Sequence, residues 1–364
     1  MLYKEVTEAL RNAIRTGEYP IDSKLPTVQE LCHRYSVSAI TIRRALDNLR
    51  EEGFVARQPR IGTTVVNSNP QSPDTRGRST PTIAYIITSF ADSFGVPLLE
   101  GVLESARGRA HILLDETSGD KDIEEQAIAT AIDAGAEGLM LLPGDSRFIP
   151  KSILDLIARK FPVTIIDRVF QGVPVATVAS DNRTAATQAT QYLFSLGHRN
   201  VAFISSSSHL SSSSLRRQGW EFAHASNSIS LEVGLSLSTL RSTLPGAPQS
   251  ERGNDLDRLV RFFRQNPHLT GCLTSEYNIA LLVKQALRML GKSIPQDMSV
   301  VCFDHNDYNF DDSMFRFTYI KQQQPEIGRS AVDLTLGQIE DGPCTDQKLL
   351  PTSLIIGQST SKIA

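Results

Sequence analysis

The sequence predicts an α/β protein in which a small, mainly helical N-terminal domain precedes a much larger domain of doubly wound parallel sheets. From Thr82 onward, short apolar runs typical of buried strands alternate with amphipathic stretches typical of helices. That alternation indicates parallel sheets covered by helices on both faces. A second series of the same kind begins near Asn200, so we expect two lobes with a cleft between them.

Residues 25–66 predict two short helices joined by a tight turn and followed by a β-hairpin wing. Thr27 and Glu30 have the spacing of a capping box at the start of the first of these helices. Ser38 is the expected N-cap of the next helix, 39–52, and Gly53 stands where a glycine ends a helix. The apolar stripe of this helix comprises Ile42, Ala45, Leu46 and Leu49.

The opposite face of helix 39–52 is mostly polar and basic. It carries Ala39, Ile40, Arg43, Arg44, Asp47 and Arg50. A helix that follows a helix and a turn, and bears arginines on its free face, suits the major groove of DNA. Residues 1–17 predict a further amphipathic helix that packs under this unit.

These features resemble the GntR family of winged-helix repressors over residues 1–66. The matching segments are Leu25-Pro26-Thr27, Val37-Ser38, Thr41-Ile42-Arg43, Ala45-Leu46, Leu49, Glu52-Gly53 and Gly62-Thr63. The resemblance implies that the start of the second helix and the wing approach DNA. The expected DNA-contacting residues are Thr27, Ser38, Ala39, Ile40, Thr41, Arg43, Arg44, Arg60 and Gly62. The chain departs from the family pattern at Val28, at Ala39 and at Arg60, which stands in place of the first wing glycine.

Composition supports a DNA-binding head on a separate body. Residues 1–66 hold ten Lys and Arg against eight Asp and Glu, whereas residues 82–364 hold 25 against 31. Residues 67–81 contain three prolines and no large apolar residue, which predicts a flexible linker. The four cysteines have no paired spacing, and neither a signal peptide nor an apolar run of membrane-spanning length is present. We therefore expect a cytoplasmic protein with no membrane partner, metal or cofactor.

Residues 82–364 resemble the LacI/GalR-type regulatory domain, which is itself similar to periplasmic sugar-binding proteins. The best-matching segments are 162–168, Ser180-Asp181-Asn182, 196–204, 216–220, 294–301, Phe303-Asp304 and Ile320-Lys321-Gln322. The family's own DNA-binding part is absent. The chain thus resembles arabinose-repressor-like hybrid regulators, with a winged helix-turn-helix at residues 1–66 and a two-lobed periplasmic-binding-protein-like domain at 82–364.

The same resemblance implies an effector site in the cleft. Arg216 is expected to reach ligand hydroxyls, since a guanidinium offers several donors in a rigid fork. Asp304 follows an apolar strand, at the sheet edge where open α/β folds bind ligands. Ser89, Asp92 and Phe94 follow the first strand, and Glu276 and Tyr277 replace the family's usual Asn-Asp. The expected effector-binding set is Ser89, Asp92, Phe94, Arg216, Glu276 and Asp304.

Other interpretations of the chain find less support. Gly291-Lys292-Ser293 mimics the end of a P-loop, but Ala286 occupies the position of the required earlier glycine, so we expect no enzyme. A transport receptor would need a secretion signal. The chain is predicted to be a homodimeric repressor of carbohydrate-use genes that binds a pseudo-palindromic double-stranded operator. Its effector is expected to be a neutral sugar, with a sugar acid, sugar phosphate or nucleobase as the alternatives.

Overall fold

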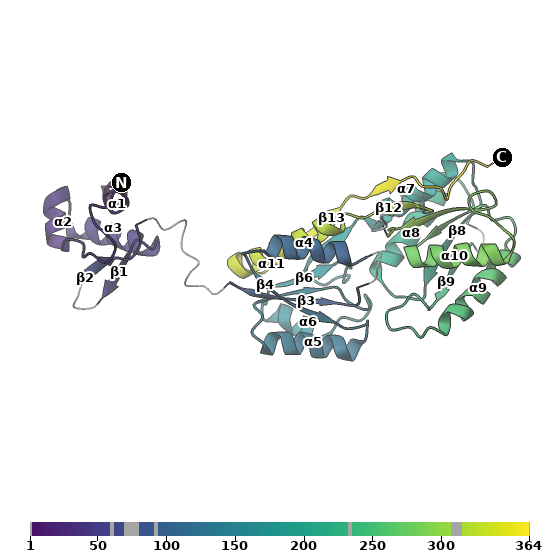
Figure 1. Cartoon of the computed structure of the whole chain (residues 1–364), viewed down its shortest axis with the longest axis horizontal. Helices are drawn as coiled ribbons and strands as arrows, with labels where there is room; N and C mark the ends of the chain where they lie inside the picture. Colours follow the sequence, from purple (N-terminus) through teal and green to yellow (C-terminus); the bar gives the residue numbers. More distant parts are fainter. Residues whose placement is uncertain are drawn as a thin grey trace. The chain divides into compact units, whose positions relative to one another are not determined.

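The computed structural model describes residues 2–58, 62–68, 80–90, 94–231, 235–306 and 315–363. The chain divides into two compact units, Met1–Thr80 and Pro81–Ala364 (Figure 1). Two of the predicted site residues, Arg60 and Asp92, lie outside the described residues.

The N-terminal unit is a three-helix domain with a two-stranded wing. Its elements are α1 (Leu2–Arg15), α2 (Val28–Tyr35), α3 (Ala39–Glu51), β1 (Val55–Gln58) and the antiparallel β2 (Gly62–Val65). The predicted capping box is present, because Glu30 N–H donates to Thr27 Oγ1 (3.3 Å) and Thr27 N–H donates to Glu30 Oε2 (2.7 Å). Thr27 Oγ1 also donates to Glu30 Oε2 (2.9 Å), and the two hydrogen bonds that this carboxylate accepts from Thr27 hold the pKa of Glu30 below its ordinary value.

The predicted apolar stripes form the core of this unit. Ile42, Ala45 and Leu49 of α3 are fully buried, and they pack with Leu10 and Ile14 of α1. The fourth stripe residue is only half-buried. α3 begins after its expected cap, since Ser38 Oγ accepts from the backbone N–H of Thr41 at 3.3 Å.

The first lobe of the C-terminal unit is a six-stranded sheet in the order β13-β7-β6-β5-β3-β4. Its strands are β3 (Thr82–Ile87), β4 (His111–Glu116), β5 (Gly138–Leu141), β6 (Val163–Ile166), β7 (Ala176–Ser180) and β13 (Gln347–Leu350), all parallel. Successive residues of β3 point to opposite faces. One face packs on α4 (Val96–Ala106) and α11 (Gln324–Asp341), and the other on α5 (Lys121–Asp133) and α6 (Lys151–Ala158).

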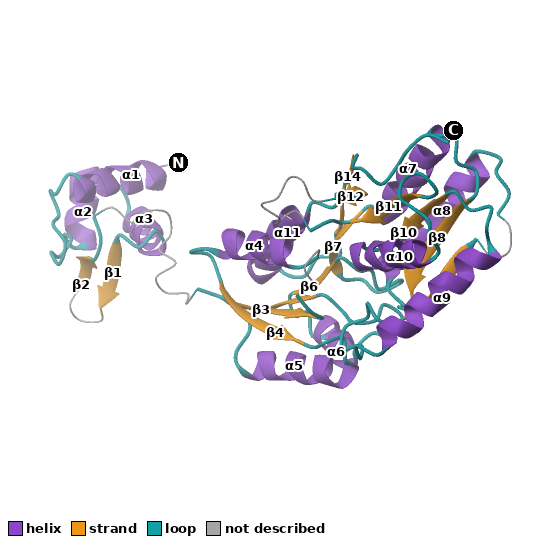
Figure 2. Cartoon of the chain, turned by 45° about the vertical axis from the view of Figure 1, so that its right-hand side comes forward, coloured by secondary structure: helices purple, strands orange, loops and turns teal. Residues whose placement is uncertain are grey.

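The second lobe repeats this plan with the order β14-β12-β11-β10-β8-β9. Its strands are β8 (Val201–Ser206), β9 (Ser236–Leu240), β10 (Gly271–Thr274), β11 (Ser299–Phe303), β12 (Thr318–Lys321) and β14 (Ser353–Ile355). Its helices are α7 (Asn182–Ser195), α8 (Ser211–Ser226), α9 (Glu251–Gln265) and α10 (Tyr277–Met289). β14 is antiparallel to its neighbour, unlike the other strands of the sheet. Figure 2 shows helices against both sheets, as the sequence predicts.

The chain passes between the lobes three times: from β7 into α7, from β12 into α11, and from β13 into β14. α11 therefore belongs to the first lobe although it follows five strands of the second. It lies so close to α4 that a Cβ atom on Gly101 would fall 2.0 Å from the Pro325 carbonyl oxygen, and one on Gly328 would fall 2.2 Å from that of Leu98. Only glycine permits this approach of two helix backbones.

The second lobe also contains a serine run and buries His198 and Trp220. The serine run 205–214 ends β8, forms the short connection 207–210 and begins α8. His198 is 3% exposed and contacts Thr270 Oγ1 and the Ser361 carbonyl oxygen. Trp220 is a core residue, and its indole donates to the Val201 carbonyl at 3.0 Å. Among the described residues, none of the helices has the length and apolar character needed to cross a membrane.

Candidate functional site

The first candidate site is the outer face of α3 with the start of the wing. Ser38, Ala39, Ile40, Arg43 and Arg44 are all exposed there, while Thr41 is half-buried. Arg43 lines a hollow together with Lys24, Thr27, Gly62 and Thr63. The guanidinium of Arg44 stacks over the ring of Tyr3, 4.5 Å from its centre.

This surface offers DNA a basic side chain beside the wing and an exposed helix N-terminus. The exposed guanidinium of Arg43 can donate to a guanine edge or to a phosphate. The hydroxyls of Thr27 and Ser38 are already engaged in capping their own helices. Their role seen in the structure is therefore to fix the ends of α2 and α3.

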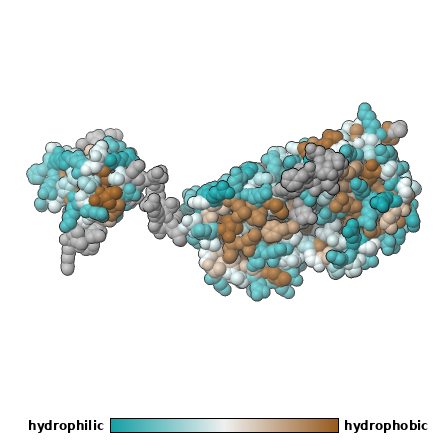
Figure 3. Space-filling view, in the orientation of Figure 1, coloured by the Kyte–Doolittle hydropathy of each residue, from teal (hydrophilic) through white to brown (hydrophobic). Residues whose placement is uncertain are grey.

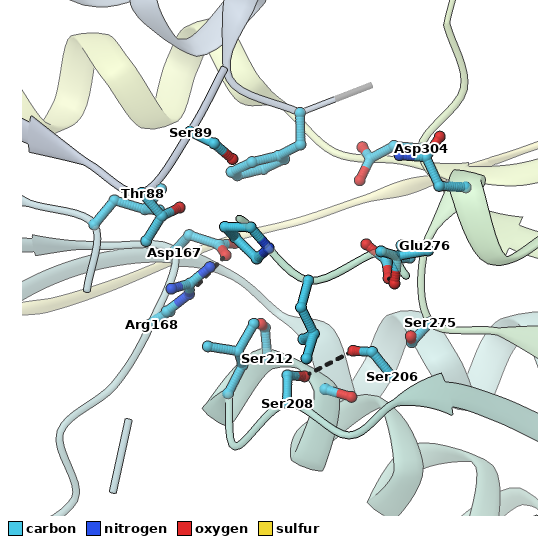
Figure 4. Close-up of a pocket in the computed structure, with 18 of the residues that line it drawn as sticks. Thr88, Ser89, Asp167, Arg168, Ser206, Ser208, Ser212, Ser275, Glu276 and Asp304 are labelled. Carbon is cyan, nitrogen blue, oxygen red and sulfur yellow. Dashed lines mark hydrogen bonds and ion pairs between the residues drawn. The ribbon is translucent and has the colours of Figure 1, made fainter. Parts of the chain in front are cut away.

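The second candidate site is a cavity between the two lobes of the C-terminal unit (Figure 4). Its described lining comes from both lobes. It comprises Thr88, Ser89, Phe94, Leu142, Asp167, Arg168, Ser206, Ser208, Leu210, Ser212, Ser213, Arg216, Thr243, Leu244, Pro245, Ser275, Glu276, Asn278, Asp304 and Gln322. Three carboxyl groups and two guanidinium groups thus meet in one small space, and eight of its twenty described lining residues are Ser or Thr.

Arg216 is the central donor of this cavity. It projects from α8 and is 7% exposed. Its Nε donates to Asn182 Oδ1 (2.7 Å), its Nη1 donates to the Ser275 carbonyl (2.5 Å), and its guanidinium stacks 3.9 Å from the centre of the Phe303 ring. Within the described residues its Nη2 has no hydrogen-bond partner, so this donor remains available to a ligand.

Asp167 and Asp304 occupy equivalent positions in the two lobes. Each directly follows a central strand, β6 or β11, and each has a left-handed backbone with φ of 61° and 59°. In each case the backbone N–H donates to the neighbouring strand, to Val178 and Ile320 respectively. The strained backbone turns both carboxyl groups toward the cavity from opposite walls, which is a favourable arrangement for holding one ligand between the lobes.

Burial alters the acidity of these carboxyl groups. It raises the pKa of Asp304 to about 6, although Arg216, Gln322 and Gln324 favour the ionised form. Gln322 and Gln324 donate to the two oxygens of Asp304 at 2.6 and 3.2 Å. Burial also raises the pKa of Asp167, against the opposing effect of Arg168 and Arg216.

The first-lobe wall leaves buried polar atoms without partners. Asp167 Oδ1 and the Nε and Nη1 atoms of Arg168 make no hydrogen bond within the described chain. Arg168 Nε lies 3.9 Å from Asp167 Oδ2. An unpaired buried polar group costs about 1–3 kcal/mol, so these atoms favour a bound molecule that satisfies them.

The loop between β9 and α9 covers the cavity on one side. Asp255 Oδ2 accepts from the backbone N–H groups of Arg241 and Ser242 at 2.8 and 2.7 Å, which fixes the base of the loop. Thr243 then donates to Glu276 Oε1 at 2.6 Å, and Leu244 and Pro245 line the cavity. Burial raises the pKa of Glu276, while Thr243 and Arg216 act against that shift.

The structure brings together all the described members of the predicted effector set: Ser89, Phe94, Arg216, Glu276 and Asp304. Tyr277, named beside Glu276, instead packs against His305 and Phe317. Sequence reasoning missed Asp167 and Arg168 as lining residues. The available signal was their place after a strand, which matches that of Asp304 in the second series.

Comparison with known proteins agrees with this two-part organisation. Residues 2–65 match the model of the gntR family of bacterial regulatory proteins, and residues 190–360 match that of the periplasmic binding protein-like domain. The chain joins a GntR-type DNA-binding domain to a periplasmic-binding-protein-like domain. This confirms the predicted recognition and the predicted fold class.

Two relatives align with this chain along most of their length. The arabinose metabolism transcriptional repressor of Geobacillus stearothermophilus is 25% identical over 93% of this chain and 91% of its own. That of Halalkalibacterium halodurans is 22% identical over 93% and 89%. These relatives are regulators, which confirms that the chain is a DNA-binding transcriptional regulator and not an enzyme.

Solved structures show the same fold. The transcriptional regulator CelR in complex with cellobiose is 19% identical, covers 92% of this chain and all of its own, and superposes with a TM-score of 0.67. The transcription regulator CcpA of Lactococcus lactis is 18% identical, covers 78% of this chain and all of its own, and superposes with a TM-score of 0.66.

Proposed function

We propose that this chain is a cytoplasmic, homodimeric repressor of carbohydrate-use genes whose affinity for a pseudo-palindromic operator changes when a small neutral sugar occupies the cavity between the lobes. In this proposal residues 1–66 bind DNA, residues 67–81 form a linker, and residues 82–364 bind the effector and dimerise. Ligand that draws the two lobes together alters the spacing of the two DNA-binding heads.

The observation that carries the sugar assignment is the mixed lining of the cavity. Carboxylates of Asp167, Glu276 and Asp304 accept hydroxyl protons, and the guanidinium groups of Arg168 and Arg216 donate to hydroxyl oxygens. A sugar hydroxyl donates and accepts at once, so it satisfies both kinds of group. The names of the relatives, which are arabinose repressors, and the cellobiose complex of CelR support the same class of effector.

A nucleobase is the second candidate, and Phe94 is the observation in its favour. A purine is held in a flat slot between aromatic rings. Among the described lining residues Phe94 is the one aromatic side chain, and half of such a slot is a weak site. Phe90, which also follows the first strand, packs against the core cluster of the first lobe.

Thermal shift against pentoses, hexoses, disaccharides, sugar acids and nucleobases tests the effector assignment. We expect stabilisation by a neutral sugar in the wild type and its loss in Asp304→Ala. Asp297→Ala, which changes an aspartate outside the cavity lining, is the control that retains the shift. Stabilisation by a purine and by no sugar would overturn the sugar assignment.

Gel-shift titration tests the DNA-binding assignment. Arg43→Ala should weaken operator binding by about 1–3 kcal/mol if Arg43 contacts a base. Folding should be unchanged, since Arg43 is exposed and lies outside the apolar stripe. Arg15→Ala at the C-terminal end of α1 is the control. Equal affinities for the wild type and Arg43→Ala would contradict the assignment.

A further inference from the structure

Ile40 is exposed to an unusual degree for an aliphatic side chain. It is 78% exposed, more than any other large hydrophobic residue in the described part of the chain, of which the next is Phe222 at 60%. An α-helix turns by about 100° per residue, so Ile40 points about 200° from the buried Ile42 and about 180° from the buried Leu49. Its side chain is therefore directed straight away from the core of the domain.

The first turn of α3 presents an apolar surface to the outside. Ala39 and Ile40 are both exposed and carry only hydrocarbon side chains. Ser38 is turned inward to its own helix, because its hydroxyl accepts from Thr41 N–H and lies 3.0 Å from Thr41 Oγ1. The nearest basic side chain on the same face is Arg43, almost one turn further along.

From this arrangement we propose that Ile40 packs against the 5-methyl group of a thymine and specifies that base in each operator half-site. The inference rests on the proposed operator binding through α3. The N-terminal residues of a recognition helix contact base edges in the major groove. Among the groups that base pairs present there, the thymine methyl is the apolar one. Arg43 would then contribute the polar contact further along the groove.

The test removes single methyl groups from the DNA. The full-length protein first selects its preferred site from a random duplex library, and each thymine of that site is then replaced by uracil, one at a time. For the wild type, one thymine per half-site should show about a three- to tenfold loss of affinity when its methyl is removed, as expected for burial of one methyl group. Ile40→Ala should bind the thymine and uracil duplexes equally.

Two variants serve as controls for this experiment. Ile40→Val keeps a branched side chain, so it should retain most of the difference between thymine and uracil. Ile21→Ala changes another exposed isoleucine of the same unit (51% exposed) that is not on α3, and it should behave like the wild type. The exposure of Ile40 means that its replacement leaves the folded core intact.

The outcomes separate the inference from the function on which it rests. If the wild type selects a site but no uracil replacement weakens binding, the thymine contact is refuted while operator binding stands. The same conclusion follows if a methyl effect persists unchanged in Ile40→Ala. If the wild type selects no sequence, operator binding itself fails and the Ile40 assignment fails with it.

Discussion

Arg216 illustrates how a single side chain can be both structural and ligand-directed. Two of its nitrogens are fixed by Asn182 and by the Ser275 carbonyl, which leaves Nη2 for the cavity. We expect Arg216→Lys to weaken effector binding by about 1.5–3 kcal/mol, because an ammonium cannot make these forked contacts. Calorimetric titration with the effector found in the thermal-shift panel would measure the loss.

The next residue in the chain supplies the control. Arg217 lies on the same helix but is exposed and pairs with Glu221 at 3.0 Å, so Arg217→Lys should bind effector like the wild type. Equal losses in the two variants would mean that the effect is not specific to the cavity.

Asp304 should make stability depend on pH. The pKa of Asp304 is about 6 in the folded chain, whereas the ordinary value is 3.8. Between about pH 4 and pH 6 the folded chain therefore keeps a proton on Asp304 that the unfolded chain releases. Its carboxylate therefore lowers the free energy of unfolding above pH 6, by about 3 kcal/mol at neutral pH, and this cost disappears as pH falls toward 4. Asp304→Asn removes the titrating group.

Thermal unfolding of the ligand-free wild type and Asp304→Asn between pH 7.5 and 4.5 measures this effect. The variant should be more stable near neutrality, with the difference shrinking as pH falls. Asp167 and Glu276, whose pKa values burial also raises, are present in both proteins and cancel in the comparison. A difference that does not change with pH would contradict the assignment.

The predictability of the cavity residues depended on local context. We predicted Arg216 and Asp304 because both stand in segments that resemble the LacI/GalR-type domain. We predicted Glu276 because, with Tyr277, it replaces the family's usual Asn-Asp. Asp167 and Arg168 also stand in such a segment. The equivalence of Asp167 and Asp304, however, depends on the positions of two strands in two different sheets. It becomes visible only when β6 and β11 are seen at matching places in their strand orders.

The loop 241–247 is the element most directly placed to control effector exchange. It is fixed at its base by the buried Asp255 and contacts the cavity through Thr243 and Pro245. Asp255→Ala should leave the two loop N–H groups without their acceptor and loosen the loop. We expect faster effector dissociation, by about tenfold for a loss of about 1.4 kcal/mol, measured by stopped-flow or surface plasmon resonance.

The same helix offers a matched control for the loop. Asp257, two residues further along α9, is exposed, and Asp257→Ala should not change the dissociation rate. An unchanged rate in Asp255→Ala would show that the loop does not limit effector release.

Helices with clear caps and stripes were predicted well, but two edge strands were not. α2 and α3 begin directly after their expected caps, Thr27 and Ser38. β9, with the sequence Ser-Leu-Ser-Thr-Leu, and β13, with the sequence Gln-Lys-Leu-Leu, were missed. Both lie at the edge of a sheet, where β9 is mostly half-buried and β13 is mostly exposed, so they lack the continuous apolar run that marks a buried strand. Their pairing comes from tertiary contacts that no local pattern records.

At the scale of the whole chain, the two strand–helix series in the sequence predicted the two lobes. They did not predict that the chain crosses between the lobes three times. α11 follows β12 of the second lobe yet covers the sheet of the first. Sequence order alone would assign it to the second lobe. Its placement depends on the close contact through Gly101 and Gly328, two glycines far apart in the sequence. Because these three passages link the lobes, we expect relative motion of the lobes to bend the chain after β7, β12 and β13.

Apolar side chains gather over both lobes on the face of the C-terminal unit shown in Figure 3, and this is where we expect a second copy to bind. Leu103 on α4 is 50% exposed, Leu114 lies on the edge strand β4 on the α4 side of the sheet, and Leu281 lies on α10. Leu103→Glu should place a charge in the dimer interface and yield monomers in sedimentation velocity. Operator affinity should then fall, because a single head makes half of the contacts and the effective concentration of the second head is lost. Leu154→Glu on α6, across the first-lobe sheet and similarly exposed at 48%, should remain dimeric. A wild type that is itself monomeric at the same concentration would refute the dimer.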